Sequence, residues 1–283
     1  MIKRARMRFL LIVTYDERAA HERDMYSMLK RVYGLQHFLA TTLFIVLDPT
    51  VEVPVYDAGT WILRLPGTES VVPGVLDKTV RALHWAFSAG FQFEYVVRSN
   101  ISTLIQLPPL NAELRMHEAK DARIHYAGGH VLMLSWIDAA HGIVSHDLFG
   151  MYFASGSCIV LSQKCARDLL HCSLDRTIVD DVAIAAALLD KQYTPHRFSP
   201  RFFFWTSCAS MLDHAWADTA LINIKNQTVA QLHAIVESRG RDMIAFRHNA
   251  FKADGADDQE ENKRDRDVKL MRITAHHVEK WLA

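Results

Sequence analysis

Arg98, Asn100 and Ser102 follow a short apolar run, and their side chains are suited to holding a ligand. Residues 93–97 are aromatic and β-branched, which predicts a buried strand. Ligands of open α/β sheets bind beyond the carboxyl ends of the strands, so the three polar residues are candidates for a binding site. The alternative is that they only turn the chain and cap a helix starting near Thr103.

Two more segments carry groups that are suited to chemistry. Asp180 and Asp181 are adjacent carboxylates at the predicted start of an alanine-rich helix. Capping of that helix would explain one of them and need not explain both. Ser155 and Gly156 lie in a run of small residues before a predicted strand, where a ligand or another backbone segment has room. The alternative for Gly156 is that it only permits a bulge.

Composition excludes several classes of protein. The chain has 283 residues, of which 50% are hydrophobic, so it is long enough to bury a full core. It has 32 basic and 32 acidic residues, and this balance gives no electrostatic footprint for nucleic acid or an anionic membrane. The four cysteines contain no Cys-x-x-Cys pair, which favours buried free thiols in a reducing compartment; they are Cys158, Cys165, Cys172 and Cys208.

The basic and apolar start of the chain superficially resembles a signal peptide. Its apolar run stops at Thr14-Tyr15-Asp16 and has no small-residue cleavage site, so we interpret it as a first buried strand. No later stretch has the roughly 20 apolar residues that a membrane span needs. We therefore expect a soluble cytoplasmic protein without a membrane span.

The order of apolar segments predicts an α/β fold. Strands are expected at 8–13, 42–47, 60–65, 94–97, 124–127, 131–136 and 159–161, and helices at 17–33, 75–89, 163–172 and 181–190. We expect one domain, 1–283, with a nucleotide-binding half at 8–105 and an acceptor and catalytic half at 106–250. The charged segment 251–267 is predicted to be mobile, and a last helix to occupy 268–283. His141, His146 and Asp147 lack the tight paired spacing of a zinc site.

Four motifs in this order resemble those of GT-A type glycosyltransferases. They are LDKTVRALHWA, FEYVVRSN, YFASGSCIVLS and VDDVAIAAALL. The chain is similar to the β-1,3-galactosyltransferase and Fringe group, and more so to glycosyltransferase-like proteins of large DNA viruses and some bacteria, which have an Arg-x-Asn-x-Ser element after the corresponding strand. The matching segments cover about residues 8–250. A viral protein of this kind would be expected in the host cytoplasm.

The resemblance implies a fold and several residue roles. The fold is a Rossmann-like nucleotide-binding half fused to an acceptor-binding half, around a mixed central sheet flanked by helices. Lys78 matches a lysine that contacts the nucleotide sugar, Ser155 and Gly156 match a turn beside the donor sugar and the acceptor, and Asp181 matches the proposed general base. Asp180 would then cap the helix on the acceptor side.

The chain departs from the family at the metal motif. Where relatives have Asp-x-Asp, it has Arg98-Ser99-Asn100, and a hard divalent cation prefers carboxylates to these ligands. An arginine there would neutralise a diphosphate directly, with Arg247 or His248 as a second such group. Mn²⁺ or Mg²⁺ is therefore compatible with the motif but not required by it. The remaining donor-side candidates are Thr14, Tyr15 and Asp57, and Asp57 would be the first suspect if a metal were needed.

The expected activity is inverting transfer of a hexose or pentose from a UDP- or GDP-sugar to an acceptor hydroxyl, on a glycan or glycoprotein. Asp181 would act as the base, and Arg98 and Lys78 would stabilise the leaving diphosphate. A catalytically inactive nucleotide-sugar or carbohydrate-binding module of the same fold is the alternative. A sugar nucleotidyltransferase would need a glycine-rich loop after the first strand, which the sequence lacks there.

Overall fold

The computed structural model describes residues 7–198, 203–205, 233–234, 236–238, 240–248 and 260–283. Contacts within the chain divide it into two compact units. The first unit comprises Met1–Asp16, Phe38–Asn100 and Glu113–Phe198, and the second comprises Glu17–His37, Ile101–Ala112 and Ser199–Ala283. We describe each unit by itself.

The first unit is built on an eight-stranded sheet with the order β11-β7-β10-β5-β1-β2-β4-β3. Four neighbouring strands, β5, β1, β2 and β4, are parallel, whereas β10 is antiparallel to both β5 and β7. The strands are β1 (Met7–Thr14), β2 (Ala40–Asp48), β3 (Val55–Asp57), β4 (Ile62–Pro66), β5 (Phe93–Asn100), β7 (Tyr126–Gly128), β10 (Ile159–Ser162) and β11 (His196–Arg197). The prediction of an α/β fold with a mixed central sheet flanked by helices is confirmed.

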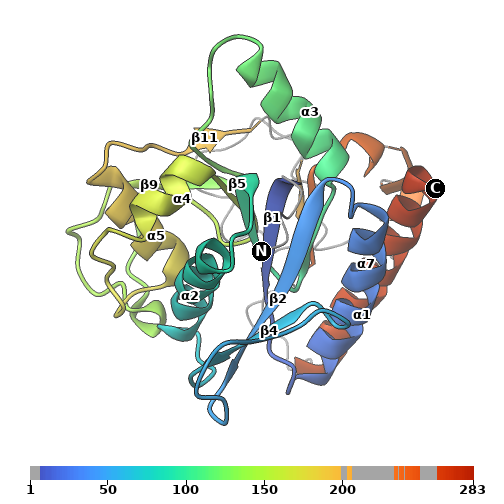
Figure 1. Ribbon diagram of the computed structural model, residues 1–283, viewed down its shortest axis with the longest axis horizontal. Coiled ribbons are helices and arrows are strands. Elements are labelled where there is room, and N and C mark those ends of the chain that lie inside the picture. Colours follow the sequence, from blue (N-terminus) through green and yellow to red (C-terminus); the bar gives the residue numbers. More distant parts are fainter. Residues whose placement is uncertain (1–6, 199–202, 206–232, 235, 239, 249–259) are drawn as a thin grey trace. The chain divides into compact units, whose positions relative to one another are not determined.

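One face of this sheet packs against three helices of the same unit (Figure 1). They are α2 (Gly74–Ser88), α4 (Gln163–Leu169) and α5 (Asp180–Leu189). Leu10 and Ile12 are fully buried in this layer, because alternate residues of a strand point to the same face. A 3-10 helix, η1 (Ala139–His141), and a small two-stranded sheet of β8 (Val131–Met133) and β9 (Tyr152–Ala154) complete the unit.

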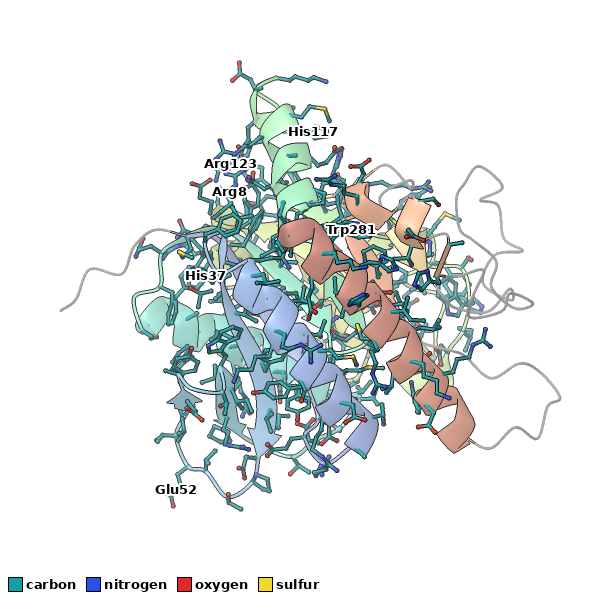
Figure 2. The ribbon with its side chains drawn as sticks, turned by 90° about the vertical axis from the view of Figure 1, so that its right-hand side faces the viewer. Arg8, His37, Glu52, His117, Arg123 and Trp281 are labelled. Carbon is teal, nitrogen blue, oxygen red and sulfur yellow. The ribbon has the colours of Figure 1, made fainter. Side chains whose placement is uncertain are left out.

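The second unit pairs two helices with a small sheet. Helices α1 (Ala20–Leu35) and α7 (Glu260–Leu282) lie side by side, as Figure 2 shows. The sheet has the order β12-β13-β6, formed by Phe203–Trp205, Ala245–Arg247 and Thr103–Ile105. Strand β6 is followed in the chain by α3 (Leu107–Glu118). A 3-10 helix, η4, covers Gly240–Asp242. The buried Gln106 amide donates hydrogen bonds to the carbonyls of Gly240 and Met243, both at 2.7 Å.

Three local predictions are corrected. The strand expected to end at Val97 continues to Asn100, because it pairs with β1 on one side and β10 on the other. The helix that the alternative interpretation placed near Thr103 is strand β6, and the next helix begins at Leu107, with two prolines in its first turn where the missing N–H groups cost little.

The C-terminal helix begins at Glu260, earlier than expected, so the charged segment is helical from there on. An ion pair between Arg264 and Asp267, one turn apart at 3.6 Å, supports this first part of α7. Residues 251–259 of the segment predicted to be mobile lie outside the described residues, as does Cys208. Within the described part of the chain, no helix has both the length and the apolar composition that a membrane crossing requires.

We expect Gln106→Leu to lower the free energy of unfolding by about 1–3 kcal/mol, because two buried carbonyls lose their donor. Chemical denaturation measures this difference. Gln92→Leu is the matched control, since Gln92 is exposed. Equal losses in the two variants would contradict the structural role of Gln106.

Candidate active site

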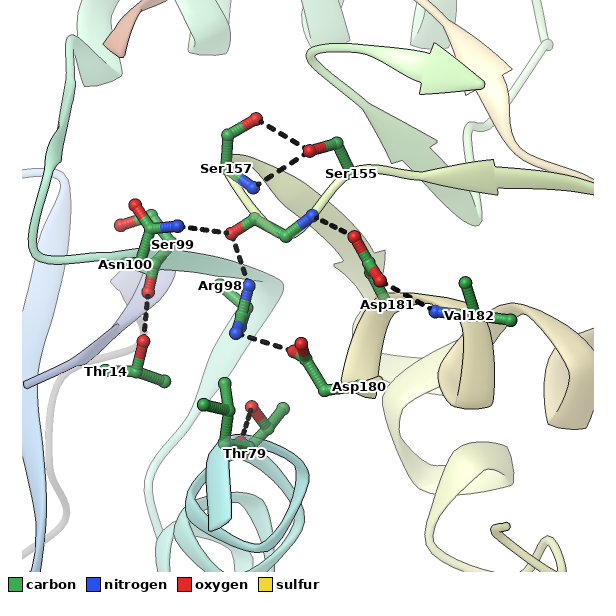
Figure 3. Close-up of polar contacts among 12 residues, drawn as sticks. Thr14, Thr79, Arg98, Ser99, Asn100, Ser155, Ser157, Asp180, Asp181 and Val182 are labelled. Carbon is green, nitrogen blue, oxygen red and sulfur yellow. Dashed lines mark hydrogen bonds and ion pairs between the residues drawn. The ribbon is translucent and has the colours of Figure 1, made fainter. Parts of the chain in front are cut away.

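Arg98 lies inside β5, with its guanidinium buried below the carboxyl end of the strand. The residue is 2% exposed. Its Nη2 forms an ion pair with Asp180 Oδ2 at 2.6 Å, and its Nη1 donates a hydrogen bond to the carbonyl of Gly156 (Figure 3). The guanidinium therefore joins β5 to the Gly156 turn and to the start of α5.

The peptide groups of Gly156 are held from two sides. Its N–H donates to Asp181 Oδ2 at 3.0 Å, while its carbonyl accepts from Arg98 and, at 3.5 Å, from Asn100 Nδ2. A Cβ atom at Gly156 would overlap Arg98 Nη1. Glycine is needed here because the guanidinium approaches the backbone so closely, which explains it better than a bulge does.

The carboxylate of Asp181 lies in surroundings that suit proton transfer. Its Oδ2 accepts from Gly156 N–H and its Oδ1 from Val182 N–H, both at 3.0 Å. Burial by the surrounding protein and the neighbouring charge of Asp180 raise the pKa of Asp181 to about 6, against the lowering effects of the Gly156 N–H and Arg98. A carboxyl with a pKa near 6 can accept a proton near neutral pH and later release it.

The prediction that Asp180 caps α5 is wrong. The N-cap residue of this helix is Val179, and no side chain accepts a hydrogen bond as its cap. Asp180 is buried and its carboxylate turns to Arg98 instead. A buried guanidinium is costly without a counter-charge, and this demand outweighs the capping preference of a carboxylate.

Lys78 is held in a second buried ion pair, with Glu69. Lys78 is 3% exposed; its Nζ lies 2.5 Å from Glu69 Oε2 and donates to the carbonyl of Tyr15 at 2.7 Å. Glu69 also accepts a hydrogen bond from the Leu47 N–H at 2.8 Å. The pair therefore ties α2 to the carboxyl ends of β1 and β2. Sequence reasoning missed Glu69 because an acid in a polar loop is usually solvated.

The other donor-side candidates from the first strand face inward. Thr14 is buried, and its hydroxyl donates to the Ser99 carbonyl at 3.5 Å. The Tyr15 ring packs edge to face against Phe44, with the ring centroids 6.4 Å apart. What Tyr15 offers at the end of β1 is the carbonyl that Lys78 uses.

The structure does not bring Asp57 together with the Arg98 network. Register partners lead from Asp57 to Ile62, Phe44, Val13 and Ser99 across four strand spacings, which is about 19 Å. Both carboxylate oxygens of Asp57 are used in its own turn, by the Gly59 N–H at 2.8 Å and the Thr60 hydroxyl at 2.7 Å. Asp57 is thus a turn residue at the edge of the sheet.

Three more candidates flank or lie outside this network. The Ser155 hydroxyl lies 3.4 Å from that of Ser157, in the same turn as Gly156. Ser102 and Arg247 belong to the second unit, where the Ser102 carbonyl accepts from His248 N–H at 2.8 Å and Arg247 Nη1 lies 3.3 Å from Thr103 Oγ1.

The donor set beside Arg98 does not fit a hard divalent cation. Asn100 presents an amide and not a carboxylate, and the guanidinium of Arg98 is adjacent to it and already neutralises Asp180. Among the described residues, no group of three or more His, Cys, Asp or Glu side chains could hold a metal ion. His141 is paired with Asp138 at 2.7 Å, and Asp147 accepts from Ser145 at 2.8 Å.

No protein-family model and no curated protein matches the sequence. Two solved structures are similar to the chain at low identity. One is an inositol-1-phosphate CTP transferase from T. maritima, with 10% identity over 69% of this chain and 86% of that chain and a TM-score of 0.37. The other is a glycosyltransferase involved in the glycosylation of the major capsid of PBCV-1, with 6% identity over 94% of this chain and 98% of that chain and a TM-score of 0.44.

Proposed function

We propose that the chain is an inverting glycosyltransferase that uses a nucleoside-diphosphate sugar. The observation that carries this proposal is Asp181, whose pKa of about 6 and fixed position against Gly156 suit a general base. The motif resemblance agrees with this role. The donor is proposed to be a UDP- or GDP-hexose or pentose, and the acceptor a hydroxyl of a glycan or glycoprotein.

In the proposed reaction, the Asp181 carboxylate takes the proton of the acceptor hydroxyl. The acceptor oxygen forms a bond to the anomeric carbon as the bond from that carbon to the diphosphate oxygen breaks. The nucleoside diphosphate leaves with the electron pair on the opposite face of the sugar, which inverts the configuration. Asp181 then releases its proton to solvent.

Arg98 and Lys78 would stabilise the leaving diphosphate by their charge, and Asn100 would donate an uncharged hydrogen bond to it. Both cations lie near carboxyl ends of parallel strands, and both are paired with carboxylates, Asp180 and Glu69. A diphosphate would add to these pairs or compete with the carboxylates for the cations. Contacts of Thr14, Tyr15, Ser102 and Arg247 with the donor stay predictions, as does the cytoplasmic location.

A non-catalytic nucleotide-sugar or carbohydrate-binding module is the second candidate. The ion pair between Arg98 and Asp180 favours this candidate. A guanidinium that is already paired with a carboxylate of the protein gains less interaction energy from binding a diphosphate. Hydrolysis of a panel of UDP- and GDP-sugars, assayed with and without Mn²⁺, separates the two candidates. Release of the nucleoside diphosphate supports the enzyme, and donor binding without release supports the module. Release that EDTA abolishes and Mn²⁺ restores would contradict the expected weak dependence on metal.

We expect Asp181→Asn to lower turnover by about 10²-fold or more while the affinity for the donor stays nearly unchanged, because only the base is lost. Steady-state kinetics and calorimetric titration measure the two quantities. Asp190→Asn, an exposed change just after α5, should leave both unchanged. Full turnover in Asp181→Asn would show that Asp181 is not the general base.

The raised pKa of Asp181 also predicts a dependence of stability on pH. Folding favours the neutral carboxyl, so its stabilising contribution is complete below pH 4 and is lost as the pH rises through 6. Relative to Asp181→Asn, the wild type should lose up to about 3 kcal/mol of unfolding free energy between pH 4 and 7. Denaturation of both proteins across this range measures the difference, and a constant difference would contradict the raised pKa.

Paired substitutions separate the structural role of Arg98 from a role in donor binding. We expect Arg98→Met to destabilise the fold by about 3–5 kcal/mol, because Asp180 is left buried without its partner. The double variant Arg98→Met/Asp180→Leu should recover most of this loss. If Arg98 contacts the diphosphate, the double variant will bind UDP or GDP roughly tenfold to a hundredfold more weakly by calorimetry. Unchanged affinity in the folded double variant would make Arg98 a scaffold residue.

A further inference from the structure

Residues 131–154 form an antiparallel ribbon that leads out from His130 and returns to Ser155, with its pairing interrupted between Leu134 and Asp138. Strands β8 and β9 pair along its base, the Leu134 N–H donates to the Met151 carbonyl at 2.8 Å, and Asp138 bridges to Ile143 further out. The Ser155 N–H donates to the His130 carbonyl at 2.8 Å. The ribbon is therefore anchored beside the proposed active site.

Large apolar side chains are exposed as pairs on this ribbon. Met133 and Tyr152 are register partners on β8 and β9, and they are 40% and 49% exposed. Ile137 and Val144 lie next to the Asp138–Ile143 bridge, on the side toward the base of the ribbon, so they oppose each other, and they are 45% and 73% exposed. The Met133–Tyr152 pair and, separately, the Ile137–Val144 pair thus present apolar surface to solvent, and paired apolar side chains mark an interaction site more often than single exposed residues do.

The exposure of these pairs is fixed by the packing of their neighbours. Leu134 and Phe153 are buried in the core of the first unit, and the ring of Trp136 packs against that of Phe153 with the centroids 6.2 Å apart. Because alternate residues of a strand face opposite sides, Tyr152 must point outward while Phe153 points inward. The strand therefore directs the Tyr152 ring to solvent.

The charge of the ribbon selects against anionic partners. Residues 131–154 include no Lys or Arg, and their acidic residues are Asp138 and Asp147. A membrane with anionic lipids or a phosphorylated acceptor would meet no cation of the ribbon itself. An uncharged partner with both apolar and polar faces fits this surface best, and a sugar ring has this character.

Tyr152 lies close to the proposed base. Ser155 is three residue steps further along the extended chain, which is about 10 Å. The next residue, Gly156, donates its N–H to Asp181, and α5 packs against β9. A glycan that places one hydroxyl at Asp181 would have its neighbouring sugar over this part of the ribbon.

We propose that Tyr152, supported by Met133 across the strand pair, is the platform on which an uncharged acceptor sugar stacks. This inference rests on the proposed glycosyltransferase function and adds the acceptor side to it. The negative face of the phenol ring attracts the positively polarised C–H groups on one face of the sugar. The stack would orient the acceptor so that its reacting hydroxyl points toward Asp181.

Saturation-transfer NMR with the methyl β-glycosides of galactose, glucose, mannose and xylose tests the platform without requiring turnover. We expect the wild type to transfer saturation to the ring protons of at least one glycoside, and Tyr152→Ala to weaken its binding by about tenfold or more. Tyr152→Phe should bind as the wild type does, because stacking needs the ring and not the hydroxyl. Phe38→Ala, which removes an exposed ring elsewhere on the first unit, should also bind normally.

Three results would overturn the platform: no transfer to any glycoside from the wild type, equal binding by Tyr152→Ala, or a loss in Phe38→Ala as large as in Tyr152→Ala. Release of UDP or GDP from nucleotide sugars is measured on the same proteins without acceptor. It should be unchanged in Tyr152→Ala, and loss of release there would show that Tyr152 has a structural role instead. Absence of release from the wild type, with glycoside binding intact, would count against the enzyme and leave the platform standing.

Discussion

The buried ion pair between Arg98 and Asp180 is the constraint on which the candidate site depends. A guanidinium with 2% exposure cannot stay charged without nearby acceptors, and here the Asp180 carboxylate and the Gly156 carbonyl provide them. These contacts fix strand β5, the Gly156 turn and the start of α5 against one another. They also require glycine at 156, because any Cβ there would meet the guanidinium.

The position and the pKa of Asp181 follow from the same network. Its neighbour Asp180 is drawn to Arg98, which leaves Asp181 to accept the Gly156 N–H. Two adjacent carboxylates in a largely buried place repel each other, and burial adds to the effect, so the proton is held more tightly on Asp181. The charged form of Asp181 is therefore maintained at a cost in folding stability, a cost that proteins commonly bear at functional sites.

Two cationic side chains at the carboxyl ends of the parallel strands each form an ion pair with a carboxylate. Arg98 pairs with Asp180 below the end of β5, and Lys78 pairs with Glu69 beside the ends of β1 and β2. Such pairs contribute little net stability when both charges are desolvated, but they fix geometry. An anion that bound here would have to share the two cations with the carboxylates of the protein.

Local sequence patterns were enough to predict the α/β class, the main strands and helices, and the three segments that form the Gly156 network, because periodicity and turn residues act over short distances. They did not predict that Asp180 would form an ion pair with Arg98 instead of capping the helix N-terminus, or that Glu69 would form an ion pair with Lys78. They also could not show that Asp57 lies four strands away from Ser99. Strand order and register decide which distant charges meet, and a buried cation takes whichever carboxylate the tertiary structure brings within reach.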